Sequence, residues 1–153
     1  MAKPRYRRVN IDGQSLYKTE TYPVEAATLP GTFCILDTTT QKFQQAVTAG
    51  AAKKLYIIGA AEHQGLDITE AVPIDNSAIG NLWEGGRVFA VRVAQGFTCV
   101  KDAPITLHAT NGKGIVATPG THVILGFADE AVTIDGAGGD DFVMVRAQYK
   151  AIS

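Results

Sequence analysis

The sequence predicts a mainly β protein, and three observations lead to this class. From Thr32 onward, short apolar or alternating runs follow one another along the chain. Gly, Pro, Asn and Asp separate these runs, as is typical of strands joined by turns. No run has the periodicity of a long amphipathic helix. We therefore expect a compact β-barrel or β-sandwich with one or two short helices, preceded by an extended N-terminal arm.

Nine runs are predicted to contain strands, and they are TFCILD, KFQQA, KLYIIGA, RVFAVRVA, FTCV, PITLHA, HVILGFA, AVTI and DFVMVRAQY. Alternation is clearest in residues 87–94 and 141–149, which indicates sheets with one mainly buried face. In the first of these runs one face is expected to carry Phe89, Val91 and Val93, and the opposite face Val88, Ala90 and Arg92.

Short helices are predicted only at Gln44–Ala52 and Asp75–Glu84. In the second segment Asp75 or Ser77 could cap a brief helix that ends at the Gly85-Gly86 pair.

The phrase PGTxxIL occurs twice, at residues 30–36 and 119–125. Proline fixes φ and glycine supplies a turn, after which threonine and the following residues suit a strand. The flanking sequences DTTTQKFQQA and GFADEAVTID do not match in register, so the phrase predicts two turn-then-strand units and not a duplicated domain.

The chain divides into an arm at residues 1–25 and a single β-rich domain at residues 26–153, which is an ordinary length for one domain. The arm begins with the basic stretch KPRYRR and continues with polar residues and interleaved tyrosines. It offers few aliphatic residues for a core.

The overall charge of −1 does not indicate any particular class of binding partner. No stretch of the sequence approaches the ~20 apolar residues of a membrane span. We expect a protein that neither crosses a membrane nor carries a standard export signal. Cys34 and Cys99 lie in apolar runs without a CxxC or Cys/His spacing, and are expected to be reduced, buried small residues.

His122 is the first suspect for metal chemistry, because GIVATPGTH is similar to the second metal motif of cupins. A metal site needs about three convergent ligands. The upstream HxH pattern is missing, since His63 and His108 stand alone. We therefore expect no metal and no cofactor.

Other catalytic patterns are also missing. The serines lack a GxSxG elbow, and GAGGDDF lacks the Lys-Ser/Thr of a phosphate loop. The acidic pairs at 129–130 and 140–141 are expected on solvated turns, because adjacent carboxylates do not face each other across a cleft. The sequence gives no support for an enzyme.

The arm carries the candidate binding residues, which are Lys3, Arg5, Tyr6, Arg7, Arg8, Tyr17 and Tyr22. Arginines with an aromatic ring could contact nucleic-acid phosphates, an acidic protein surface, or only solvent. Because the β domain does not continue the basic stretch, a protein surface is favoured over nucleic acid.

In order and texture, residues 24–148 resemble the capsid decoration, or cement, proteins of tailed bacteriophages. The similar segments are VEAATLPGTFCILD, TTTQKFQQA, KLYIIGAAEHQGLDITEAV, LWEGGRVFAVRVAQGFTCV and GKGIVATPGTHVILGFADEAV with GGDDFVMVRA. The resemblance implies a small β-rich domain, commonly trimeric, made in the bacterial cytoplasm and bound to the outer surface of an assembled shell. Its partner would be the major capsid protein, and the arm would contact that protein or neighbouring subunits.

Two alternatives remain open at this point. One is a small cupin-like, metal-dependent β-barrel enzyme built around His122. The other is a carbohydrate-binding β module of the virion surface, in which Trp83 and the tyrosines form sugar platforms. Trp83 could equally be an interface aromatic or a packing residue beside a turn.

Overall fold

The structure is a computed structural model that describes residues 5–11, 19–47, 53–136 and 138–152, with the side chains of 149–152 excepted. It contains two five-stranded sheets, and the strand pairs within them are antiparallel. The first sheet has the order β1 (Thr19–Pro23), β5 (Ser77–Leu82), β4 (Tyr56–Ile58), β2 (Phe33–Asp37) and β3 (Lys42–Gln45). The second has the order β6 (Val88–Val93), β12 (Asp141–Ile152), β10 (Val123–Ala128), β8 (Pro104–Leu107) and β9 (Gly114–Val116).

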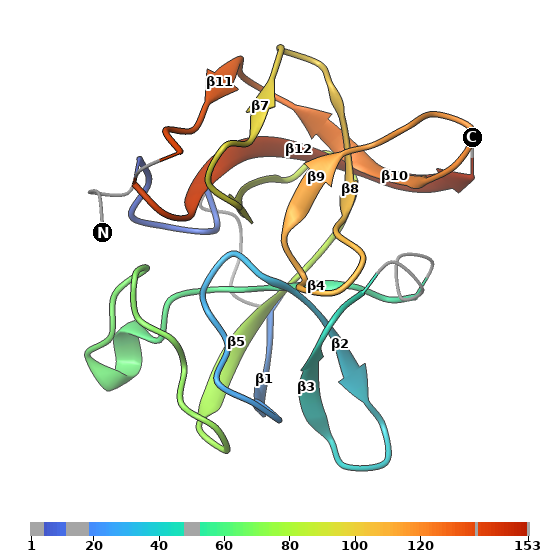
Figure 1. Cartoon of the computed structure of the whole chain (residues 1–153). Helices are drawn as coiled ribbons and strands as arrows, with labels where there is room; N and C mark the ends of the chain where they lie inside the picture. The colour runs from blue at the N-terminus through green and yellow to red at the C-terminus, as the bar shows by residue number, and fades with distance from the viewer. Residues whose placement is uncertain (1–4, 12–18, 48–52, 137, 153) are drawn as a thin grey trace.

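The two sheets form two layers, with β1, β5, β2 and β3 in the lower half of Figure 1 and β12, β10, β8 and β9 in the upper half. A small third sheet pairs β7 (Thr98–Cys99) with β11 (Val132–Thr133). The described helix is a single 3-10 turn, η3 (Glu62–Gln64). The mainly β prediction is confirmed, and each of the nine predicted runs contains a strand. Among the described residues, no helix is long and apolar enough to cross a membrane.

The helix predicted at Asp75–Glu84 is wrong, because Ser77–Leu82 is strand β5. Asp75 does not cap a helix; it has a φ of 64° and ends the preceding turn. The strand forms because both of its edges find partners, β1 on one side and β4 on the other. In the other segment predicted to be helical, Gln44 and Gln45 belong to β3, and residues 48–52 lie outside the described part.

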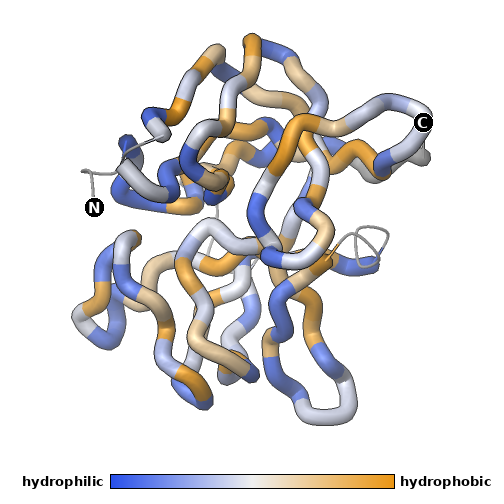
Figure 2. The backbone as a smooth tube through the Cα atoms, viewed as in Figure 1, coloured by the Kyte–Doolittle hydropathy of each residue, from blue (hydrophilic) through white to orange (hydrophobic). Residues whose placement is uncertain are grey.

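Consecutive residues of the first sheet point into two different cores. Phe33 and Ile57 pack in the larger core shared with the second sheet, whereas their neighbours Cys34 and Tyr56 pack in a smaller core on the other face. This alternation follows from the period of two along a strand, and hydrophilic and hydrophobic residues alternate along the strands in Figure 2. The first sheet also curls, so that Val24, just after β1, bridges to Phe43 of β3.

Strand β6 is buried on both faces, which corrects the expectation of one mainly buried face. All six of its residues are buried, including Arg92. The second face is covered by the first PGT turn, whose Pro30 carbonyl accepts a hydrogen bond from Nε of the Arg92 side chain at 2.8 Å. The chain around Ile68 lies there too, because its carbonyl accepts a bond from the Arg92 side chain at 3.0 Å.

Both PGTxxIL phrases are turns that lead into strands, as predicted. Gly31 and Gly120 have φ values of 81° and 84°, and β2 and β10 follow them. Their surroundings differ, because an added Cβ at Gly31 would lie 2.6 Å from the ring of Phe142, whereas Gly120 has no such neighbour within 4 Å. The first phrase therefore also joins the two sheets, and only a glycine fits at its turn.

Candidate functional site

Residues 9–11 lie along the edge of β6, and residues 5–8 lead up to them beside Glu130 and the start of β12. The Ala90 amide donates to the Val9 carbonyl at 2.8 Å, and the Ile11 amide donates to the Val88 carbonyl at 3.1 Å. Asn10 forms an antiparallel bridge with Phe89, and Val9 is only 2% exposed. This part of the predicted arm has bends and one bridge in place of a continuous strand, and it is packed against the β domain.

Glu130 holds the beginning of this segment through a group that we call the Glu130 clasp, consisting of Glu130, Arg5 and Tyr6. The guanidinium of Arg5 donates to both carboxylate oxygens of Glu130, each at 2.8 Å. The Tyr6 hydroxyl donates to the same carboxylate at 2.9 Å. The amide of Met144 donates to it at 3.0 Å, so the carboxylate is fixed from β12 as well. A bidentate, charge-assisted pair of this kind is among the stronger hydrogen-bonded contacts in proteins.

The electrostatics of the clasp favour its charged form. Burial raises the pKa of Glu130, but the hydrogen bonds from Arg5, Met144 and Tyr6 together outweigh burial, and the pKa lies below its ordinary value. Burial, with the bond to Glu130, raises the pKa of Tyr6 to about 12. The bond to Glu130 also raises the pKa of Arg5. Near neutral pH the group therefore contains a carboxylate, a guanidinium and a neutral phenol.

The next two arginines of the segment are presented differently. Arg7 and Arg8 are both exposed. Arg7 lines an open hollow of about 580 Å³ together with the chain around η3, including Glu62 and Asp67. The basic stretch is thus divided into a clasped part, Arg5 and Tyr6, and a solvent-facing part, Arg7 and Arg8. Lys3 and Tyr17, also predicted as binding residues, lie outside the described residues.

Tyr22 is part of β1 and lies on the first sheet, away from the clasp. Its ring contacts Phe43 edge to face, with centroids 5.7 Å apart. Together with Lys53, Lys54 and Tyr56 it lines an open groove of about 390 Å³. Arg5, Tyr6 and Tyr22, which were predicted as one binding arm, therefore belong to two separate surfaces.

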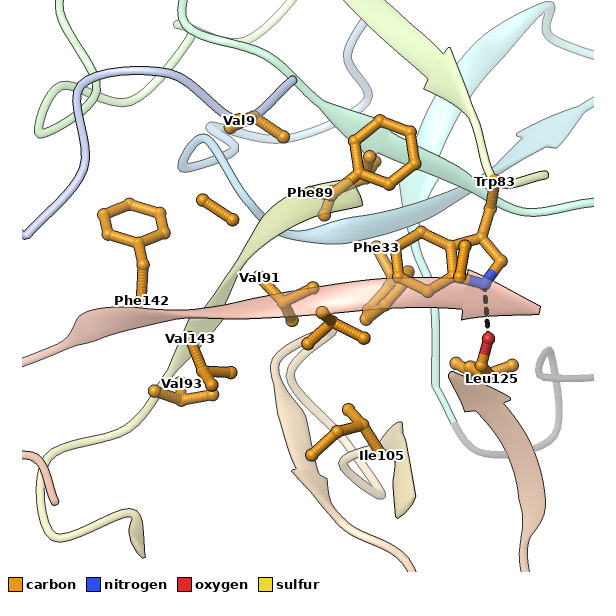
Figure 3. Packing of buried hydrophobic residues seen from close by; sticks show 14 of the residues in the cluster. Val9, Phe33, Trp83, Phe89, Val91, Val93, Ile105, Leu125, Phe142 and Val143 are labelled. Atoms are coloured by element: carbon orange, nitrogen blue, oxygen red, sulfur yellow. Dashed lines mark hydrogen bonds between the residues drawn. The ribbon is translucent and has the colours of Figure 1, made fainter. Parts of the chain in front are cut away.

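Trp83 lies in the larger core between the sheets (Figure 3). It is 8% exposed and stacks on Phe89 with centroids 5.2 Å apart, while Phe33 meets it edge to face at 4.8 Å. Its indole N–H donates to the Leu125 carbonyl at 2.9 Å, the dashed line in Figure 3. Trp83 is therefore a packing residue, which was one of the alternatives left open by the sequence. Protein atoms cover the indole ring.

The histidines do not converge. The Nδ1 atom of His122 accepts a hydrogen bond from the Thr118 amide at 2.9 Å, which closes the second PGT turn. The Nδ1 of His108 accepts similarly from Thr110 at 3.2 Å. Within the described ranges, no three His, Cys, Asp or Glu side chains are grouped so that they could hold a metal ion. Both cysteines are free; Cys34 is buried as expected, whereas Cys99 is half-buried.

The expectation for the acidic pairs is only partly met: Asp129 and Glu130 lie on a bend after β10, but their carboxylates are paired with cations, and Asp141 begins β12. Asp129 accepts from Lys101 at 3.1 Å and from Arg146 at 3.0 Å. The bond from Lys101, helped by Arg146, lowers the pKa of Asp129. Asp140 pairs with Lys113 at 2.8 Å. Asp129 and Asp140 thus neutralise lysine and arginine side chains of other segments.

Two important residues were missed in the sequence. Glu130 stood out only as part of an acidic pair and its role gave no signal, because its partners Arg5 and Tyr6 are more than 120 positions away. Arg92 did give one, as a cation in the middle of the apolar run RVFAVRVA, and such a residue is almost never buried unless it is paired.

Comparison with known proteins gives no family for this chain. No protein-family model matches the sequence, and no curated protein matches it significantly.

Proposed function

We propose that the chain is a non-enzymatic structural protein that binds the outer surface of an assembled phage capsid and stabilises the junctions between capsomers. Its partner in this proposal is the major capsid protein, and the chain acts as a homo-oligomer, by analogy a trimer. The proposal starts from the resemblance to phage decoration proteins in the order and composition of the sequence segments.

The observation that carries the proposal furthest is the division of the basic stretch. Arg7 and Arg8 are exposed on a backbone that is anchored on both sides, by the clasp at residues 5 and 6 and by Val9 in the core. Anchoring lowers the entropy cost of binding, because the two cations are already held on the surface of a rigid sheet. Such a pair suits an acidic protein surface, and its contribution would be salt-sensitive.

No catalytic step is needed for this role. A ligand that binds the assembled shell and not its separated subunits stabilises the shell by mass action. Many copies, each bridging neighbouring subunits, would add avidity even where one contact is weak.

The test is sedimentation of the purified protein with and without assembled phage heads, with a count of bound copies per shell. We expect saturable binding at a copy number that matches the shell symmetry. Absence of binding to mature heads would contradict the proposal.

The double variant Arg7→Ser/Arg8→Ser tests the surface, because it removes two charges and leaves the clasp intact. We expect weaker binding and a smaller salt dependence than for the unchanged protein. Lys53→Ser/Lys54→Ser is the matched control, since it removes the same charge from the groove beside Tyr22. Equal losses in both variants would show that net charge, and not this surface, governs binding.

A further inference from the structure

We propose that residues 5–11, here called the strap, release from the edge of β6 while the rest of the domain stays folded, and that the Glu130 clasp controls this release. The inference rests on the proposed function for the use of the strap. The release itself is a property of the free protein and can be measured without a capsid.

The strap pairs with β6 over a much shorter length than β12 does. Main-chain hydrogen bonds at Ala90 and Ile11 join it to β6, and Val9, with the partly buried Tyr6 and Ile11, packs on the larger core. On the opposite edge, β6 pairs with β12 over six residues, from Val88↔Arg146 to Val93↔Asp141. Segments with few buried apolar contacts and few hydrogen bonds open locally at lower free energy than core strands do. The strap is therefore expected to open separately from the β6–β12 pair.

The clasp supplies a large part of the attachment, and solvent can reach it. The side chains of Arg5 and Glu130 are 35% and 17% exposed. The segment start is held further by the Arg5 amide, which donates to Asp141 Oδ1 at 3.1 Å, and by Arg5 Nη1, which donates to the Phe142 carbonyl at 3.2 Å. A competing carboxylate could take over Arg5 and Tyr6, because one charged hydrogen-bonded pair would be exchanged for another.

Release would create two matched surfaces. On the domain, the Val88 carbonyl and the Ala90 amide at the edge of β6 lose their bonds to the strap and can pair with another extended segment. On the strap, Arg5 and Tyr6 join Arg7 and Arg8 as one continuous basic and aromatic stretch. The partner that fits this arrangement is an acidic protein surface with an extended segment beside it. In the proposed function Arg7 and Arg8 meet the shell while the strap is docked, and release adds Arg5 and Tyr6 to that contact.

Amide hydrogen exchange on the full-length variant Glu130→Gln tests the inference. Glutamine keeps the shape of the side chain and removes the charge that binds Arg5. Where opening is followed by fast reclosing, the exchange rate is proportional to the open population. We expect the Ala90 amide, which bonds to the strap, to exchange about tenfold faster or more, as the loss of a charged hydrogen-bonded pair implies. Tryptic cleavage at Arg5, Arg7 and Arg8 should accelerate in parallel.

The Arg92 amide is the internal control, because it lies on the same strand and bonds to Gly31 instead of to the strap. Its exchange should not change. The control variant is Glu25→Gln, which removes a charge from an exposed residue that follows β1 in the first sheet. An unchanged Ala90 rate in Glu130→Gln, or equal acceleration at Arg92, would overturn the inference.

Two further variants cover the case in which Glu130→Gln does not fold. Tyr6→Phe removes one hydroxyl, and Arg5→Gln removes the charge from the other side of the pair. Both should accelerate exchange at Ala90, Arg5→Gln by more. If neither does, the strap is not controlled by the clasp.

Sedimentation with phage heads separates this inference from the proposed function. Faster strap release without any binding to heads would support the strap and contradict the proposed function. Binding to heads with an unchanged Ala90 exchange rate in the clasp variants would support the proposed function and contradict the control of strap release by the clasp.

Discussion

The guanidinium of Arg92 lies over the ring of Phe142, with its carbon 4.8 Å from the ring centroid. The two residues are direct partners on the neighbouring strands β6 and β12. Arg92 also donates to the Pro30 carbonyl at 2.8 Å and to the Ile68 carbonyl at 3.0 Å, and its Nη1 lies 3.7 Å from Asp140. One buried cation thus ties the first PGT turn and the chain around Ile68 to the second sheet.

Arg92→Met is expected to lower the free energy of unfolding by about 3 kcal/mol or more, because two carbonyl groups lose a buried charged donor. Urea unfolding at neutral pH measures this change. Arg146→Met is the control, since Arg146 also pairs with an aspartate but its side chain is 54% exposed. The control should lose less than about 1 kcal/mol. Similar losses for the two variants would contradict the role given to Arg92.

Stability should depend on pH through Glu130. Its pKa is lower in the folded protein than its ordinary value, so folding favours the carboxylate. This contribution is complete above the ordinary glutamate pKa, and it is lost as the pH falls through the lower folded value. Unfolding midpoints in urea, measured stepwise through the acid range, should fall more steeply for the unchanged protein than for Glu130→Gln. Parallel curves would contradict the prediction, since aspartates such as Asp129 and Asp37 contribute equally to both proteins.

Gly80→Ala should destabilise the first sheet. An added Cβ would lie 2.5 Å from Cζ of Phe43, and that ring is packed against Tyr56 at a centroid distance of 5.1 Å. Overpacking of this kind typically costs about 1–3 kcal/mol. Thermal unfolding should show the loss. Gly136→Ala is the control, because no atom lies within 4 Å of its added Cβ, and a change beyond about 0.5 kcal/mol there would be unexpected.

Trp83 is the only tryptophan of the chain, so its fluorescence reports directly on the larger core. We expect blue-shifted emission in the native state with weak quenching by acrylamide, and a red shift on unfolding. Trp83→Phe should cost about 1–3 kcal/mol, because the Leu125 carbonyl loses its indole donor and the core loses volume. Strong quenching of the native protein, or a change of emission on adding glycans, would revive the carbohydrate-binding alternative.

The predictable part of the site was the location of the basic residues and not their roles. KPRYRR stood out by its basic composition, but nothing in the sequence distinguished the roles of Arg5, Arg7 and Arg8. All three arginines are exposed, but the structure separates Arg5, which Glu130 binds, from Arg7 and Arg8, which lie between the clasp and the buried Val9. That separation depends on β12 and on the chain after β10, which bring Glu130 and the Met144 amide to the same place. No local pattern around Arg5 contains this information.

The sequence by itself determined the β class, the positions of nine strands and both PGT turns, because alternation and turn chemistry act over a few neighbouring residues. Only the tertiary structure decided that Ser77–Leu82 is a strand, that β6 is covered on both faces, and that residues 9–11 bond to the edge of β6. A strand without partners has no stability of its own, so its existence depends on segments far away in the chain. The same holds for Arg92 and Glu130, whose charges are tolerated at their positions only because distant carbonyls, carboxylates and arginines meet them there.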